Sequence, residues 1–302
     1  MGLNVSALAD FNNEIAGELI VRTVYEGQTT SILPVKTGIK HQEPLNLFDV
    51  DLVIQNGTCV STPSGSMIAS QRDITVTPRT SFDGLCLKTL DTKYLGISAL
   101  GAGSYNETFA LANAYGEMLT NQFAKSNDAF LWNASSGSSQ GLGYLTSAAN
   151  TGVVVPAAAT GSFTSATALE IIDTLIENLN TDVADRDDLT VWMSVANFRK
   201  YVTGLRQANN FYFDPASVTN RSGLLSMAYP FQNVKVVGTS GITGDRVALM
   251  PDAYAVVGVD LESDLDEFQM WYDINSDQLK HRISTKLGVQ VAYPEYIVSN
   301  GL

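Results

Sequence analysis

The chain has 302 residues, enough for one large domain or two smaller ones. Charged residues make up only 16%, against roughly 25% in ordinary soluble domains, which favours a protein whose surface is largely covered by partners. The net charge of −13 argues against a sequence-reading DNA-binding protein, because such a protein needs a basic face. Cys59 and Cys86 are too few for a disulfide framework, so we interpret both as reduced thiols.

The first 80 residues predict an arm followed by a hairpin. Leu8, Phe11, Ile15 and Leu19 recur at steps of three and four, which predicts an amphipathic helix within an N-terminal arm over residues 1–29. Residues 30–80 alternate, are rich in β-branched side chains and contain the hairpin dipeptide Asn56-Gly57. We therefore expect an extended β-hairpin with little packing on the core of its own chain.

A long helix follows. Ser104 and Glu107 have the spacing of a capping box, in which the serine caps the helix start and the glutamate reaches back to it. Apolar residues then recur at helical spacing, which predicts one helix over about residues 105–132. At 1.5 Å per residue it would span about 40 Å, so it could serve as a spine.

The rest of the chain mixes helices and strands. Residues 167–180 predict a second helix, and Ser194 is expected to cap a third after the buried strand 189–193. Strands are predicted in the sequences NVKVVG, RVALM, AYAVVGV, EFQMWYD, QLKHRIST and GVQVAYPEYIV. This order indicates an α+β fold with two lobes. No run of 18 apolar residues occurs, so we expect no membrane-spanning helix.

The Gly/Ser-rich stretch after the long helix contains the pattern G-x-S-x-G at Gly137, Ser139 and Gly141. A nucleophile elbow needs a strand before the serine and a helix after it, and here a helix comes first. The available bases are His41, in the hairpin, and His281, which we expect to point outward from a strand. We therefore interpret the stretch as a helix C-terminal turn, with Gly141 and Gly143 allowing the turn, followed by an extended crossing.

Other kinds of site have weak patterns. Two cysteines and two histidines lie far apart and give no zinc spacing. Asp273, Asn275 and Asp277 open like a calcium loop, but the glycine and glutamate that such a loop needs are missing. Acidic clusters at residues 182–188 and 260–267 are typical of solvated surfaces. We predict no cofactor, no metal and no catalytic residue.

Four passages, taken in order, resemble the major capsid proteins of tailed bacteriophages of the Hong Kong 97 type. They are FLWNASSGSSQGLGYLTSA (130–148), DDLTVWMSVANFRKYVTGLRQANNFYFDP (187–215), PFQNVKVVGTSGITGDRVALMPDAYAVVGVD (230–260) and KLGVQVAYPEYIV (286–298). Each match alone is loose, and their shared order over most of the chain carries the resemblance. The predicted order of arm, hairpin, long helix, α/β region and returning strands is also similar.

The resemblance implies a division of the chain. Residues 1–29 would form the N-terminal arm, 30–80 the hairpin called the E-loop, and 81–158 the first part of a peripheral (P) domain with its spine helix. Residues 159–245 would form the axial (A) domain, 246–286 the P-domain strands, and 287–302 a segment that returns to the A-domain.

The resemblance also implies a function. The chain would self-assemble as pentamers and hexamers into an icosahedral head that encloses double-stranded DNA without sequence-specific binding. Portal and scaffolding proteins would be partners, as would a decoration protein in some members, and the location would be the virion, after assembly in the host cytoplasm. The expected inter-subunit contacts come from charged hairpin residues: Lys36, Lys40, Glu43, Asp49, Asp51, Arg72, Asp73 and Arg79.

Two departures and two alternatives accompany this interpretation. The arm begins at once, leaving no room for the scaffolding segment that many members carry, and Lys36 and Lys40 lie at the hairpin base, so cross-linking is not carried over. One alternative is an encapsulin, which has the same fold but encloses an enzyme. The other is a soluble α+β enzyme that uses an acidic cluster or Ser139.

Overall fold

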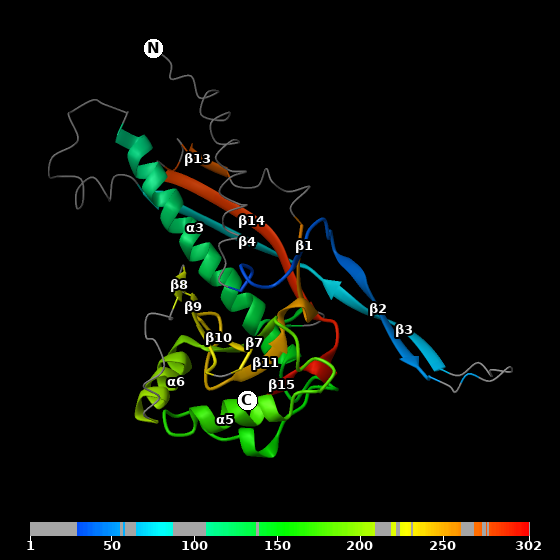
Figure 1. The fold of residues 1–302 in the computed structure, drawn as a ribbon. Helices are drawn as coiled ribbons and strands as arrows, with labels where there is room; N and C mark the ends of the chain where they lie inside the picture. The colour runs from blue at the N-terminus through cyan, green and yellow to red at the C-terminus, as the bar shows by residue number, and fades with distance from the viewer. Residues whose placement is uncertain are drawn as a thin grey trace, which may run out of the picture.

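A long helix beside a long, mostly antiparallel sheet forms one part of the molecule, and a six-stranded sheet flanked by helices forms the other (Figure 1). The computed structural model describes residues 29–54, 57, 65–86, 107–136, 139–208, 219–221, 224–230, 232–260, 269–273, 276 and 278–301. The two parts confirm the predicted α+β class. The predicted arm helix, Cys59 and most of the 260–267 acidic cluster lie outside the described residues.

The first sheet is built around one strand, β14 (Gln278–Val291). It pairs antiparallel with three other strands along its length, and a short first strand completes the sheet beside β12. These strands are β4 (Thr77–Cys86), β12 (Ala255–Val259), β13 (Gln269–Asp273) and β1 (Val35–Lys36). Helix α3 (Glu107–Asn133) runs alongside β14 and β4 in Figure 1 and ends within one residue of the prediction.

The second sheet has the order β15-β11-β7-β10-β9-β8 and is parallel only between β10 and β7. All six residues of its central strand β7 are buried. Its strands are β7 (Leu189–Ser194), β8 (Thr219–Arg221), β9 (Leu224–Ala228), β10 (Lys235–Thr239), β11 (Val247–Pro251) and β15 (Val298–Ser299).

Two helices pack on this sheet, α5 (Ala168–Glu177), predicted from its apolar spacing, and α6 (Val195–Gln207), predicted from its cap residue. The Ser194 side chain accepts a hydrogen bond from the backbone N–H of Asn197, which confirms the predicted cap of α6. Single-turn 3-10 helices lie in connections at Ala157–Ala159, Asp252–Tyr254 and Pro294–Tyr296.

A two-stranded hairpin projects from the body (Figure 1). It consists of β2 (Gln42–Leu52) and β3 (Gly65–Thr75), paired antiparallel from Gln42↔Thr75 to Leu52↔Gly65. The residues on either side of it belong to the body, because β1 pairs with β12 and β4 pairs with β14. The hairpin therefore occupies the middle of the predicted 30–80 segment, and the full division of the chain into domains stays a prediction.

The segment after α3 differs from the prediction of a turn and an extended crossing. Two short strands, β5 (Ser135–Ser136) and β6 (Ser139–Gln140), are followed by a single helical turn, α4 (Leu142–Leu145). Leu142 and Leu145 are buried in the cluster that also contains Trp132 and Trp192. Apolar burial of this turn against the body accounts for the helix that the prediction missed.

Candidate functional site

The outer half of the hairpin exposes an apolar face. Phe48, Val50 and Leu52 share one face of β2, because strand side chains alternate, and Met67 lies directly opposite Val50. All four are exposed, and Leu52 keeps 77% of its surface accessible. Large exposed apolar patches mark interaction surfaces on soluble proteins. A two-stranded ribbon is at best marginally stable alone, so contact with another surface would stabilise this half of the hairpin.

The base of the hairpin is buried against its own body. Ile39, Ile74 and Val76 form a small buried cluster, called here the root cluster. It lies over a cross-strand glycine pair, Gly258 and Gly288, which face each other in β12 and β14. A Cβ on Gly288 would stand 2.0 Å from the Thr75 carbonyl oxygen, and one on Gly258 would stand 2.8 Å from the Ile74 side chain. Only glycine lets the hairpin cross the sheet this closely.

Beyond the root cluster, three polar contacts join the hairpin to the end of β14. The Arg72 guanidinium donates to the carbonyl oxygen of Val291 at 2.9 Å, and the Gln290 amide donates to the carbonyl oxygen of Asp73 at 2.8 Å. Farther out, the Tyr293 hydroxyl donates to the Phe48 carbonyl oxygen at 3.3 Å. We call these three bonds the polar latch. Each joins a side chain to a backbone carbonyl.

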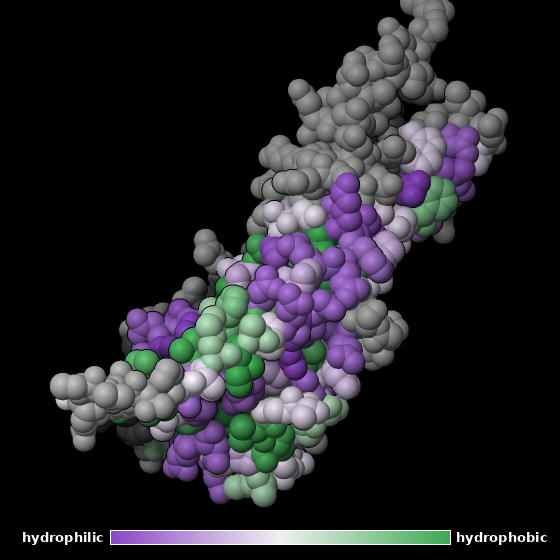
Figure 2. Space-filling view, turned by 90° about the vertical axis from the view of Figure 1, so that its right-hand side faces the viewer, coloured by the Kyte–Doolittle hydropathy of each residue, from purple (hydrophilic) through white to green (hydrophobic). Residues whose placement is uncertain are grey.

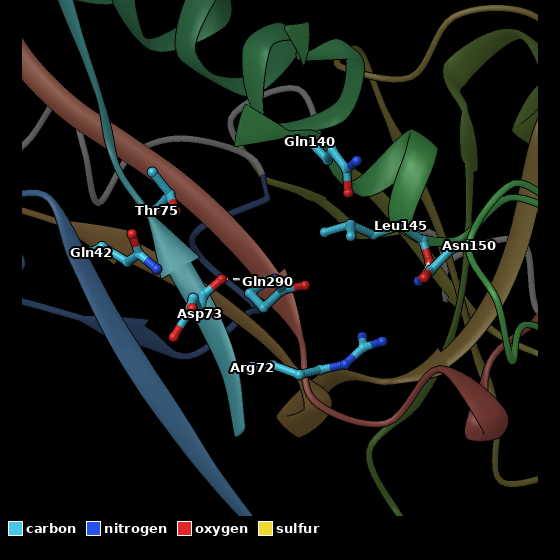
Figure 3. A pocket seen from close by; sticks show the side chains of 8 residues that line it. All are labelled: Gln42, Arg72, Asp73, Thr75, Gln140, Leu145, Asn150 and Gln290. Atoms are coloured by element: carbon cyan, nitrogen blue, oxygen red, sulfur yellow. Dashed lines mark hydrogen bonds between the residues drawn. The ribbon is translucent and has the colours of Figure 1, made fainter. Parts of the chain in front are cut away.

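A polar cleft of about 360 Å³ lies beside the latch. Figure 3 shows its two walls, and Arg72 extends from the end of β3 across the space below Leu145 and Asn150. The hairpin wall consists of Gln42, Arg72, Asp73 and Thr75, and the body wall of Gln140, Leu145, Asn150 and Gln290. Among the described residues, neither histidine and no serine lines this cleft.

The charged residues predicted as inter-subunit contacts fall into two groups. Lys36 and Glu43 form an ion pair with each other at 2.5 Å, and Arg72 belongs to the polar latch. Arg79 donates to the carbonyl oxygen and hydroxyl of Ser126 and lies 4.5 Å over the Phe130 ring of α3, where burial lowers its pKa. The exposed residues are Lys40, Asp49, Asp51 and Asp73. An inter-subunit role for any of the eight stays a prediction.

The predicted helix-start and turn residues have different outcomes. Ser104 lies outside the described residues, so the capping box stays a prediction, although Glu107 is the first described residue of α3. Gly141 and Gly143 flank the start of α4 where the chain returns against Trp132. A Cβ on Gly143 would stand 2.5 Å from the Trp132 carbonyl oxygen and 1.9 Å from the Arg246 guanidinium. Both glycines allow this close packing, and the turn role that the sequence assigned to them stays a prediction.

His281 was predicted to point outward, and the structure shows that this is wrong. Its side chain is 1% exposed, and burial lowers its pKa. In β14, residues 281, 283, 285, 287, 289 and 291 share one face, and all of them are buried. The even spacing of His281 from Ile283 and Leu287 was visible in the sequence and was the signal that placed His281 inside.

Two aspartates near the end of β7 have shifted pKa values. Burial raises the pKa of Asp252 to about 6, although its carboxylate accepts hydrogen bonds from the Thr190 hydroxyl and the Trp192 indole. Hydrogen bonds from the Arg186 guanidinium lower the pKa of Asp188. The latter pair belongs to the 182–188 acidic cluster and fixes the loop before β7.

Searches for other kinds of site were confined to the described residues. Within those ranges, no group of three or more His, Cys, Asp or Glu side chains is arranged to hold a metal ion. In the same part of the chain, no helix is both long enough and apolar enough to cross a membrane.

Sequence reasoning gave the hairpin charges as candidates and passed over its apolar side chains. The sequence NLFDVDL alternates Phe48, Val50 and Leu52 with Asp49 and Asp51. That pattern shows a strand with one apolar face, but it does not show whether the face is covered. The contacts of β2 and β3, which pair only with each other, supply the missing information.

Comparison with known proteins finds relatives by structure alone. No protein-family model matches the chain, and no curated protein matches it by sequence. The capsid of an empty GTA particle matches with a TM-score of 0.57 and 12% identity, over 91% of this chain and 89% of the other. A virus-like particle from Pyrococcus furiosus matches with a TM-score of 0.52 and 12% identity, over 95% and 97%.

The satellite phage P4 procapsid structure, which includes the size determination protein Sid, also matches. Its TM-score is 0.52 and its identity 10%, over 94% of this chain and 98% of that chain. At these identities the likeness concerns the fold. The chain therefore has the capsid fold of the Hong Kong 97 type, as its sequence resemblance implied.

Proposed function

We propose that this chain is the subunit of a closed protein shell and that its role is structural, with no catalytic residue. The observation that carries the proposal is the exposed apolar face of the hairpin, on a fold that other shell subunits share over more than nine-tenths of this chain. In an assembly, that face would be covered by a second copy. Figure 2 shows the side toward which the hairpin points, where separate apolar patches interrupt a hydrophilic surface.

The finer proposal is the major capsid protein of a tailed phage. Pentamers and hexamers would form an icosahedral head around double-stranded DNA, with portal and scaffolding proteins as partners. The net charge of −13 supports a container that does not grip its DNA, because tight non-specific binding comes from basic side chains that release counterions. In this proposal α3 with the β14 sheet forms the P-domain, and the six-stranded sheet forms most of the A-domain.

The test replaces the apolar face and leaves the body intact. The variant Phe48→Thr, Val50→Thr, Met67→Gln should remain folded, because these side chains are already exposed in the single chain, and should lose shell formation. The matched control Ser66→Asn, Ser70→Asn alters exposed positions on the opposite face of β3, outside the predicted charged contacts, and should still assemble. Electron microscopy and light scattering would measure shell formation by the variant and by the control. Shells of unchanged yield from the first variant would contradict the proposal.

A shell around a protein cargo, as in an encapsulin, is the second candidate. The virus-like particle from Pyrococcus furiosus matches over 95% and 97% of the two chains and the satellite phage P4 procapsid over 94% and 98%, so both kinds of shell remain candidates. The contents of purified particles distinguish the two functions. Nuclease-protected DNA would support the phage head, and a defined protein inside the shell would support the encapsulin.

A further inference from the structure

Three tyrosines lie together on the surface of the body, at the ends of two single-turn helices. Tyr254 ends one of these helices, Tyr296 ends the other, and Tyr293 lies just before the second. The ring centroid of Tyr254 is 5.2 Å from that of Tyr293 and 5.6 Å from that of Tyr296, and the last two centroids are 5.8 Å apart. All three residues are partly exposed. We call them the tyrosine patch.

One ring of the tyrosine patch already holds a cation of its own chain. The Arg186 guanidinium stands 4.8 Å over the centre of the Tyr254 ring and donates to the Tyr254 hydroxyl at 3.3 Å. It also donates to both carboxylate oxygens of Asp188, at 2.7 and 2.8 Å. Arginine suits this arrangement because its flat guanidinium stacks on a ring and binds a carboxylate with two bonds. The ring and the carboxylate therefore share one cation.

The Tyr296 ring is also surrounded by carboxylates. Burial raises the pKa of the Tyr296 hydroxyl, and three nearby carboxylates raise it further: those of Asp182, Glu295 and Asp49. These three residues are exposed and come from separate segments, the loop before β7, the second single-turn helix and the hairpin strand β2. Among the described residues, none of the three forms an ion pair. Tyr296 thus has the ring and the carboxylates of the first arrangement, and no guanidinium of its own chain is bound to those carboxylates.

We propose that the tyrosine patch is a docking surface for a basic partner protein, which places an arginine against the Tyr296 ring and the carboxylates around it. The partner's guanidinium would repeat at Tyr296 the arrangement that Arg186 has at Tyr254. The attraction between a cation and an aromatic ring is stronger where water is partly excluded. Tyr296 is only partly exposed, so the contact is shielded from water on one side.

The charge of the chain favours a partner of different sequence over a second copy. With a net charge of −13, two copies repel each other at long range, whereas a basic protein is attracted. This inference goes beyond the proposed function, because the contact needs one copy of this chain and no shell.

The experiment measures peptide binding to the purified chain by isothermal titration at low ionic strength. The probe is a blocked glycine peptide that carries two arginines, and its matched peptide carries citrulline, which has nearly the same shape without the charge. The arginine peptide should bind at least about tenfold more tightly than the citrulline peptide, because only the guanidinium is a cation. Tyr296→Leu should weaken binding of the arginine peptide about fivefold, because it removes the aromatic face.

A second variant tests the carboxylates without changing the ring. Asp182→Asn, Glu295→Gln should also weaken binding of the arginine peptide about fivefold, and it keeps the test decisive if Tyr296→Leu fails to fold. The matched control Glu177→Gln, Asp185→Asn removes the same number of exposed charges away from Tyr296 and should bind like the parent. Tyr296→Phe, which keeps the ring, should also bind like the parent.

Three results would overturn the proposal. The arginine peptide could fail to bind, or it could bind the carboxylate variant and its matched control equally, which would show attraction to the whole acidic chain rather than to this surface. Light scattering gives the third, a self-association of the chain that Tyr296→Leu abolishes, because another copy would then occupy the patch. All these measurements are made without shells, so a chain that never assembles would count against the proposed function alone.

Discussion

Strands β7 and β3 are both rich in apolar residues, yet their surroundings are opposite. Every residue of β7 is buried, with Trp192 packed on Trp132 at 5.5 Å between ring centroids, whereas residues 65–70 of β3 are all exposed, with Ile68 58% accessible. The first strand finds its apolar partners within its own chain. The base of β3 is buried through Ile74 in the root cluster, but its outer half contacts no apolar surface beyond the hairpin among the described residues. The composition of that outer half is explained by a surface that another copy would provide.

The largest expected effect comes from the body side of this comparison. Trp192→Ala would leave a cavity in the main core and remove the indole bond to Asp252. We expect the free energy of unfolding to fall by about 3–5 kcal/mol. Ile68→Ala, on the exposed strand, should change it by less than about 0.5 kcal/mol. Chemical denaturation of the unassembled chain measures both, and equal losses would break the distinction between the two strands.

An intermediate effect on stability is expected at the hairpin root, where the exposed hairpin joins the buried body. Gly288→Ala would force a Cβ against the Thr75 backbone, so the hairpin root must move. We expect a loss of about 1–3 kcal/mol from overpacking, together with loss of shells. Gly161→Ala is the control, because a Cβ there meets nothing within 4 Å. Calorimetry and electron microscopy would follow each variant, and normal shells from Gly288→Ala would show that the close crossing is unimportant.

The smallest expected effect is the dependence of the body's stability on pH, through Asp252. The pKa of Asp252 is about 6 in the folded chain, above its ordinary value of 3.8, so the folded state binds more protons than the unfolded state between these values. This group therefore adds stability as pH falls, by about 1 kcal/mol from pH 8 to pH 5. Asp252→Asn should remove that gain.

Two other shifted groups do not obscure the result. The pKa of His281 is lowered by burial, so its contribution to stability falls as pH drops through the unfolded-state value of 6.5. The pKa of Asp188 is lowered too, so its contribution is lost only below 3.8. His281 is the same in the parent and in Asp252→Asn, and Asp188 titrates below the pH range compared, so the difference between the two denaturation series from pH 8 to pH 5 isolates Asp252. If the stability of the parent and of Asp252→Asn changed with pH to the same extent, the result would contradict the account that burial raises the pKa of Asp252.

Local patterns in the sequence were enough for most elements. Apolar spacing placed α3 and α5, Ser194 marked the start of α6, and alternation placed the hairpin and β14. These features depend on interactions within a few residues, or on which face of one element is apolar. The resemblance to capsid proteins rested on the order of such elements, and the structural comparisons confirm the fold that it implied.

The errors and omissions came from contacts between distant segments. Gly288 is adjacent to Thr75 because β3 crosses β14, and Gly143 lies against Trp132 because α4 folds back on α3. Neither approach has a local sequence pattern. His281 differs, since its spacing from Ile283 placed it on the apolar face, and the error came from giving the polarity of one side chain more weight than the period of the strand.

Electron microscopy of the purified chain, with its mass measured in solution, tests the central claim most directly. The account predicts closed shells, or rings of five or six subunits, in which the hairpin's apolar face is covered by a neighbouring copy. A chain that stays monomeric even when expressed with the genes beside its own would contradict it, because the exposed strand would then have no partner surface.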